Sequence, residues 1–218
     1  MRTTNTDSYT KSENIASRVR NTVNEIISFS GISEYCCVGI VDIVNSTNIT
    51  AKLPHAKVCA YYSTFLNTMS RFVKGFGATT VKNIGDSLLY YFPKISDPDN
   101  KHAFNEVVDC GMMMIEARTA INEKMYENKL PDLDYRISAD YGCIMIADSM
   151  TSFNKDVFGS PVNICNKINS MTPPNTMVIG SDLYQHVKDK QDYYFKEIRA
   201  CTVGHKYKYP IYSVQRIG

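Results

Sequence analysis

Apolar residues recur at two different spacings along this chain, and the two spacings separate helices from strands. Apolar positions three and four residues apart run over residues 11–29 and again over residues 99–127, which predicts two amphipathic helices. A third helical stretch extends from the polar residues after Val44 to about Phe72 and is expected to break at Pro54. Apolar runs bounded by turn residues predict strands at residues 35–44, 78–83, 87–92, 135–148, 176–180, 193–198 and 206–214.

The second half of the chain adds two features to this pattern. The run YRISADYGCIMIAD is expected to form a strand pair that pivots near Tyr141-Gly142. The run DVFGSPVNICNKINSM begins at a strand end and becomes a helix, and residues 181–189 predict another helix. The order β-α-β-β-α-β with a terminal extension favours an α+β fold, a ferredoxin-like βαββαβ sandwich with extra C-terminal strands.

The chain shows no internal repeat, linker or low-complexity segment, which predicts a single domain over residues 31–218. Residues 1–10 are polar and are expected to be disordered. Residues 11–30 are expected to form an amphipathic helix that docks on the domain or on a second chain.

Composition excludes several classes of protein. Hydrophobic residues make up 44% of the 218 positions and charged residues 21%, as in ordinary soluble domains. The net charge of +2 gives no electrostatic reason to expect a nucleic acid or a membrane surface as a partner. The longest apolar runs are far shorter than the roughly 20 residues of a membrane span, and the N-terminal residues lack the apolar core of a signal peptide. These features predict a cytoplasmic protein.

The seven cysteines support the same compartment, because they show no C-x-x-C spacing. We expect all of them to be reduced and most to be buried. Five lie in apolar surroundings, namely Cys36, Cys37, Cys59, Cys110 and Cys143.

Two aspartates stand where strands are expected to end. Asp42 follows a run that is apolar on both sides, where a charge is unfavourable unless it is paired or bound to a metal. Asp86 lies beside Gly85 on a predicted hairpin turn. If the hairpin lies next to the strand of Asp42, both carboxylates project from one sheet edge and could hold two divalent metals. Taken singly, Asp42 is equally compatible with a plain turn, and an aspartate in the position of Asp86 is more often a plain turn residue.

Other polar residues could contact a nucleotide. Asn45-Ser46-Thr47 can cap the helix that follows, and the free N–H groups of that first turn suit a phosphate. Lys82 precedes Asp86 by four residues, and on spacing alone it is a solvated charge. Asn163 and Lys167 follow Asp156 and share one helix face, where they could contact a ribose and a phosphate. They could also form the polar side of an ordinary helix.

Three blocks in order carry a resemblance to a known family: VGIVDIVNST, GATTVKNIGDSLLYYF and DVFGSPVNICNKI. Together they resemble a class III nucleotidyl cyclase catalytic domain, over about residues 36–214. The separation of 44 residues between Asp42 and Asp86, and of seven between Asp156 and Asn163, is similar to that of the family.

The resemblance implies a homodimer with two sites at the interface. Asp42 and Asp86 of one subunit would hold two Mg²⁺ or Mn²⁺ ions, and the backbone carbonyl of Ile43 would complete one coordination shell. Lys82 and Asp156 of the other subunit would read the base of the nucleotide.

The resemblance also implies roles for three further residues. Asn163 would orient the ribose, Lys167 would stabilise charge on the transferring phosphate, and Lys206 would contact the terminal phosphates. Most members of the family carry arginine at the position of Lys167. Lysine keeps the charge but lacks the planar two-pronged donor, which predicts a slower enzyme.

The resemblance implies conversion of a nucleoside triphosphate to its 3′,5′-cyclic monophosphate. Lys82 can only donate and an ionised Asp156 can only accept, which suits N1 and the 6-amino group of adenine and favours ATP. UTP or CTP stays open, as in the anti-phage pyrimidine cyclases. A catalytically silent binding or dimerisation module of the same fold is the alternative from another class, and a nucleic-acid-binding ferredoxin-like domain is a third.

Overall fold

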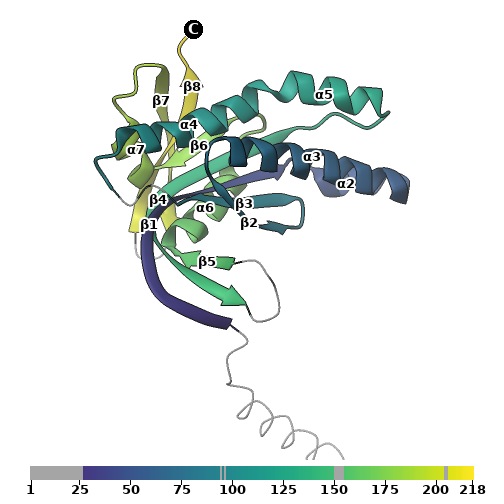
Figure 1. Cartoon of the computed structure of the whole chain (residues 1–218). Helices are drawn as coiled ribbons and strands as arrows, with labels where there is room; N and C mark the ends of the chain where they lie inside the picture. Colours follow the sequence, from purple (N-terminus) through teal and green to yellow (C-terminus); the bar gives the residue numbers. More distant parts are fainter. Residues whose placement is uncertain (1–26, 94, 96, 150–154, 204–205) are drawn as a thin grey trace, which may run out of the picture.

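The computed structural model describes residues 27–93, 95, 97–149, 155–203 and 206–218. This part of the chain forms a mixed sheet in the order β2-β3-β1-β4-β6-β8-β7, with β5 pairing with β4 beside this path (Figure 1). Strands β4 and β6 are parallel, and the other neighbours are antiparallel. The strands are β1 (Ile27–Ile43), β2 (Thr79–Ile84), β3 (Ser87–Phe92), β4 (Tyr135–Ser149), β5 (Lys155–Gly159), β6 (Met177–Gly180), β7 (Tyr193–Val203) and β8 (Lys206–Arg216).

Helices pack on both faces of this sheet. One buried cluster joins the sheet to α3, α4, α5 and α7, and two others join the opposite face to α6. Among the described helices, none has both the length and the apolar character needed to cross a membrane. The helices are α2 (Ser46–Thr50), α3 (His55–Gly75), α4 (Lys101–Glu116), α5 (Arg118–Glu127), α6 (Ser160–Met171) and α7 (Ser181–Val187).

Strand β1 is buried on both faces because its side chains alternate between the two layers. Cys37 and Val41 belong to the cluster under α3 and α4, whereas Cys36, Val38 and Ile40 belong to the cluster that includes α6 and β5. This alternation explains why the sequence reads as a continuous apolar run, and it confirms the predicted α+β sandwich.

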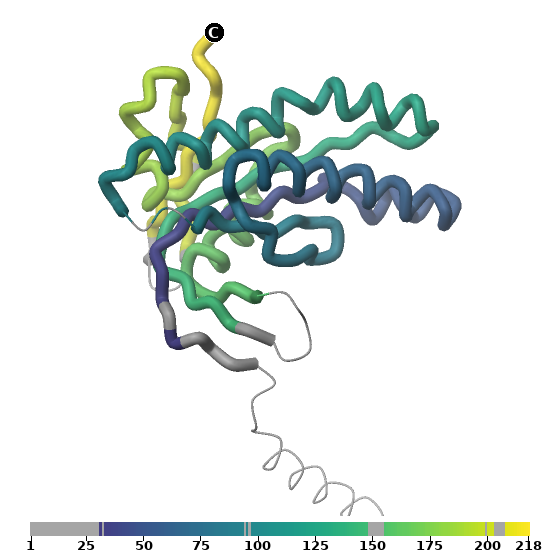
Figure 2. Tube along the Cα trace, in the orientation of Figure 1, coloured from purple at the N-terminus to yellow at the C-terminus, as the bar shows by residue number. Residues whose placement is uncertain are grey.

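Strands β1 and β4 run side by side through the middle of the molecule (Figure 2). Their register extends from Ile43 opposite Tyr135 to Ile27 opposite Ser149, with a shift between Phe29 and Ser33. This long pairing positions the two strand ends that carry the candidate site.

Three expectations about individual elements were wrong. The last residues of the predicted N-terminal helix, residues 27–30, belong to β1, because pairing with β4 outweighs the local helical spacing; residues 1–26 lie outside the described part of the chain. The predicted strand pair around Tyr141-Gly142 is one continuous strand, since Gly142 keeps its place opposite Cys36. The predicted helix over residues 99–127 is divided at Ala117 into α4 and α5.

The cysteines agree with the expectation that all are reduced and most are buried. All seven are free thiols, and five of them are buried. Cys59 and Cys143 are exposed although their neighbours in the sequence are apolar. Cys59 lies on the outer side of α3, and Cys143 lies on β4 opposite the exposed Tyr35.

Candidate active site

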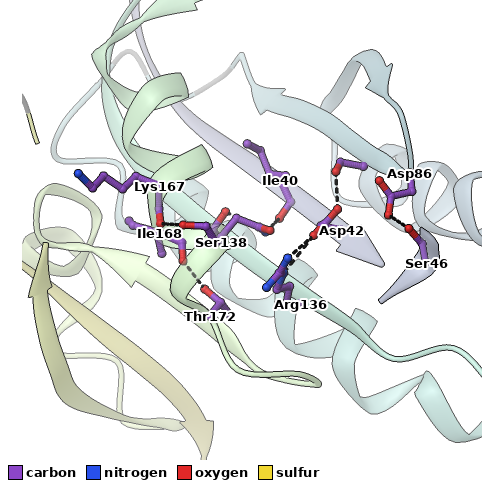
Figure 3. Close-up of polar contacts among 12 residues, drawn as sticks. Ile40, Asp42, Ser46, Asp86, Arg136, Ser138, Lys167, Ile168 and Thr172 are labelled. Carbon is purple, nitrogen blue, oxygen red and sulfur yellow. Dashed lines mark hydrogen bonds and ion pairs between the residues drawn. The ribbon is translucent and has the colours of Figure 1, made fainter. Parts of the chain in front are cut away.

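The two candidate metal carboxylates lie at the same end of the neighbouring strands β1 and β3. Asp42 near the end of β1 lies opposite Ser87, the first residue of β3, so Asp86 directly precedes its cross-strand neighbour. The chain reverses between β2 and β3 at Gly85, whose φ of 64° suits a residue without a Cβ. The sequence-based condition for convergence, that the hairpin lies beside the strand of Asp42, is therefore met (Figure 3).

Asp42 is held by donors from both neighbouring strands. Ser87 Oγ donates to its Oδ1 at 2.5 Å, and Arg136 Nε and Nη2 donate to its Oδ2 at 3.0 and 2.9 Å. The Asp42 side chain is 13% exposed and that of Arg136 is 26% exposed. The charge at the strand end is thus paired, as its apolar surroundings demand.

Sequence reasoning missed Arg136. It lies 94 residues after Asp42, and only the β1–β4 register brings the two together. The available signal was a lone arginine at the start of an otherwise apolar strand run.

Asp86 is also held by the protein. Ser46 Oγ, at the start of α2, donates to its Oδ2 (Figure 3). Ser46 is 6% exposed, so this hydroxyl is committed to the carboxylate. Each of the two carboxylates therefore has a serine donor.

This donor set fits magnesium or manganese bound together with a nucleotide. Among the described residues, no group of three or more His, Cys, Asp or Glu side chains could hold a metal ion by itself. Mg²⁺ is usually held through one or two carboxylates, waters and substrate phosphates, which is what Asp42 and Asp86 can offer. Ile43 is the next residue of β1, with a buried side chain; the role of its carbonyl stays a prediction.

The expected helix cap at Asn45-Ser46-Thr47 is not formed by side chains. Asn45 has a left-handed backbone, with φ 62°, and α2 has no side-chain cap hydrogen bond. The Asn45 Oδ1 atom accepts from Asn48 at 2.6 Å, and the Ser46 hydroxyl is used by Asp86. Thr47 is exposed. The role of this segment in phosphate binding stays a prediction.

The two candidate base-reading residues form an ion pair within one chain. Lys82 Nζ donates to Asp156 Oδ2 at 2.5 Å, with side chains 44% and 29% exposed. Val157 N donates to the other carboxylate oxygen at 2.9 Å. Residues 74 positions apart in sequence are thus brought together, at the contact between β2 and β5.

A β-bulge in β2 directs Lys82 toward Asp156. Thr80 lies opposite Tyr90, but Lys82 lies opposite Leu89, so two residues of β2 advance while β3 advances by one. Tyr90 and Leu89 belong to the cores on opposite faces of the sheet. Lys82 therefore lies on the same side of the sheet as Leu89. The buried cluster on that side also contains Val157 of β5.

Asn163 and Lys167 lie on the exposed side of α6. Between them, Ile164 and Cys165 are buried against the sheet. Figure 3 shows Lys167 pointing away from Asp42 and Asp86. Within one chain, Asp42 and Asp86 therefore lie at the ends of neighbouring strands, and Lys82 forms an ion pair with Asp156. Lys167 does not point toward the two carboxylates.

Lys206 is the first residue of β8. Its side chain lies outside the described part of the structure, so its contact with terminal phosphates stays a prediction.

A fully buried carboxylate lies on β4. Asp140 on β4 is fully buried, and its oxygens accept from Leu183 N at 3.1 Å and from the Tyr209 hydroxyl at 2.7 Å. Burial raises the pKa of Asp140 to about 7, against the lowering effect of these hydrogen bonds. Burial and the Asp140 charge also raise the pKa of Tyr209. These contacts join α7 and β8 to β4.

Comparison with known proteins agrees with this geometry. The family model for the adenylate and guanylate cyclase catalytic domain matches residues 30–216. The chain belongs to this family. This match confirms the family that the three sequence blocks resembled.

Individual relatives are distant in sequence but similar in fold. An adenylate cyclase of Streptomyces coelicolor is 22% identical over 142 residues, which are 65% of this cyclase chain and 31% of that protein. The chain thus spans about a third of that relative's length. The crystal structure of the adenylyl cyclase CyaB from P. aeruginosa has a TM-score of 0.77 at 19% identity, covering 86% of this chain and 96% of that one.

A guanylyl cyclase is equally similar. The crystal structure of the guanylyl cyclase Cya2 also has a TM-score of 0.77, at 20% identity, covering 86% of this chain and 95% of that one. The structural relatives therefore establish the class III cyclase fold. They include both an adenylyl and a guanylyl cyclase at the same TM-score, so they do not distinguish ATP from GTP as the substrate.

Proposed function

We propose that this chain is a nucleotidyl cyclase that converts ATP to 3′,5′-cyclic AMP and pyrophosphate in a homodimer. The observation that carries the proposal is the separation of two half-sites on one chain. Asp42 and Asp86 meet at one sheet edge, while Lys167 on α6 points away from them. A second copy related by a twofold axis would supply the missing half to each site.

In each composite site, Asp42 and Asp86 of one chain would hold two Mg²⁺ or Mn²⁺ ions, with the Ile43 carbonyl as a further oxygen donor. When bound, the metals would lower the pKa of the ribose 3′-hydroxyl and neutralise charge on the triphosphate. Ser87 and Ser46 would keep the carboxylates oriented through the hydroxyl bonds already present.

The other chain would position the reacting atoms. Asn163 would hold the ribose so that its 3′-oxygen lies in line with the α-phosphorus and the leaving pyrophosphate. Lys167 would donate to the α-phosphate oxygens as charge develops on them, and Lys206 would contact the terminal phosphates. The 3′-oxygen forms the new bond to phosphorus, the bond to pyrophosphate breaks, and the hydroxyl proton leaves to solvent.

The Lys82–Asp156 pair supports adenine as the base. A lysine donor beside a carboxylate acceptor matches the N1 acceptor and the 6-amino donor, which are neighbours on the adenine edge. Cytosine presents the same order, with its N3 acceptor beside its 4-amino donor, so CTP is the second candidate. Guanine and uracil present the reverse order, which leaves GTP and UTP with unpaired groups.

A product assay tests this function. Purified protein is incubated with Mn²⁺ and ATP, GTP, CTP or UTP separately, and cyclic products are identified by mass spectrometry, with EDTA as the blank. We expect cyclic AMP to dominate and cyclic CMP to come second. A folded dimer that gives no product with any of the four nucleotides contradicts catalysis and favours the silent module.

Variants of the metal carboxylates test the chemistry separately from the fold. Asp42→Ala and Asp86→Ala should each lower the cyclisation rate by about a thousandfold or more, because the site loses a ligand for the metals. The thermal midpoint of each variant is measured beside the rate and should show a folded protein, since Arg136 is 26% exposed and can be solvated once Asp42 is removed. Retained activity in either variant would overturn the two-metal assignment.

A further inference from the structure

A small buried polar network fixes α6 on the sheet. The Asn169 amide, in the last turn of α6, donates to the Ile40 carbonyl of β1 at 3.4 Å and to Ser138 Oγ of β4 at 3.3 Å. Ser138 Oγ in turn donates to the Cys165 carbonyl, one turn earlier in α6, at 2.9 Å. Figure 3 shows this network around Ser138 and Ile40.

The network lies among buried apolar side chains. Asn169 is 5% exposed and Ser138 is fully buried, and the neighbouring α6 residues Ile164 and Ile168 are apolar and buried. A buried amide is tolerated only when its donors are bonded, whereas leucine of similar size would pack without that requirement. Asn169 and Ser138 therefore add directional hydrogen bonds between α6 and the sheet.

Directional bonds restrict motions that apolar packing allows. Apolar burial is non-directional, whereas the side-chain amide of Asn169 donates to two specific acceptors, the Ile40 carbonyl and Ser138 Oγ, and so favours one rotation and one position of α6 on the sheet. Asn163 and Lys167 lie on the exposed face of this same helix. Any rotation of α6 would move them relative to a nucleotide bound by a second copy.

We propose that Asn169 is a positioning residue for cyclisation. Through Ile40 and Ser138 it holds α6 at the angle at which Asn163 and Lys167 meet the nucleotide. The proposal rests on the function proposed above, and it assigns Asn169 to the site completed by its own α6, rather than to the site that uses its own Asp42.

The first test compares matched leucine variants on α6. Asn169→Leu should lower kcat by about tenfold to a hundredfold, because a small displacement of the reacting groups is amplified in the rate. KM for ATP should stay within about twofold, since the Lys82–Asp156 pair is untouched. Asn166→Leu is the control, because Asn166 is exposed and donates only to Val162 within the helix. An unchanged kcat in Asn169→Leu overturns the proposal.

A double-mutant cycle separates positioning from general weakening of the fold. In an Asn163→Ala background, Asn169→Leu should add less loss of kcat than it causes alone, since one of the two residues that it positions is gone and only the effect through Lys167 is left. Multiplicative losses, together with a large fall in the thermal midpoint of Asn169→Leu alone, would assign Asn169 a purely structural role.

Mixed dimers show which site Asn169 serves. In a dimer of Asp42→Ala with Asn169→Leu, one site combines the intact Asp42 of the second chain with the intact α6 of the first. Equal mixing after subunit exchange should recover about a quarter of the wild-type rate per chain, because half of the dimers are mixed and each has one complete site. No recovery means that Asn169 acts through β1 on its own Asp42, which overturns the assignment to α6.

The same mixing also distinguishes this inference from the proposed function. If mixing Asp42→Ala with Asn163→Ala restores activity but mixing it with Asn169→Leu does not, the sites are shared between two chains and the proposed role of Asn169 is wrong. If neither mixture recovers, although mixed dimers are present, the composite site itself is wrong.

Discussion

Single residues at the sheet edge show how much of the site is assembled before any substrate binds. Both oxygens of Asp42 already accept hydrogen bonds, one from Ser87 and one from Arg136. A metal that binds an oxygen of Asp42 would therefore compete with Ser87 or with the Arg136 guanidinium for that oxygen. Lys82 and Asp156 likewise neutralise each other in an ion pair.

The base-reading pair is tested by exchanging its polarity. The double variant Lys82→Glu with Asp156→Cys removes the donor–acceptor order that matches adenine. The ratio of kcat/KM for ATP to that for GTP should fall by at least about tenfold, because buried polar groups of the base lose their partners. Lys188→Glu, a similar charge change on an exposed residue after α7, is the control. An unchanged ratio would mean that other residues read the base.

Lys167 is tested by supplying the two-pronged donor that lysine lacks. Lys167→Arg should raise kcat, because a guanidinium can bond two phosphate oxygens at once. Lys167→Gln, which removes the charge, should lower it. A lower rate in the arginine variant would show that the site is adapted to lysine.

Among whole elements, α7 and β8 are both linked to β4 through one buried carboxylate. Asp140 accepts hydrogen bonds from the Leu183 N–H at the start of α7 and from Tyr209 on β8. Tyr209 lies three residues after Lys206, so the same contact anchors the strand that begins with the candidate phosphate lysine.

This contact predicts a pH-dependent stability. The pKa of Asp140 is raised from 3.8 to about 7 in the folded protein, so between these values the folded state binds the proton that the unfolded state has lost. The contribution of Asp140 to stability is therefore full below about pH 4 and decreases as the pH rises toward 7. The thermal midpoint of Asp140→Asn, relative to wild type, should rise between pH 5 and pH 8.

The exposed Asp189→Asn is the control for this titration and should show no such trend. A difference between Asp140→Asn and wild type that stays constant from pH 5 to pH 8 would contradict the raised pKa.

Elements also show what the sequence can and cannot predict. The hairpin of Asp86 was predictable because its turn is encoded locally by Gly85, and the convergence with Asp42 followed from placing that hairpin beside β1. Arg136 was not predictable, because its contact depends on a register set 94 residues away. The N-terminal extension of β1 and the bulge before Lys82 have the same origin, since each is decided by a partner strand.

At the scale of the whole molecule, the proposed function requires two copies of the chain. The residues proposed to hold the metals and those proposed to position the nucleotide lie on one chain but would serve different sites. A dimer of this kind would explain why Lys167 on α6 points away from Asp42 and Asp86.

The most direct measurement is therefore the activity of mixed dimers of Asp42→Ala and Asn163→Ala, isolated with two different affinity tags. Each variant alone should be nearly inactive. The mixed dimer should recover about half of the rate of a wild-type dimer, because one of its two sites combines an intact Asp42 with an intact Asn163. Mixed dimers that remain as inactive as either variant would contradict the composite site.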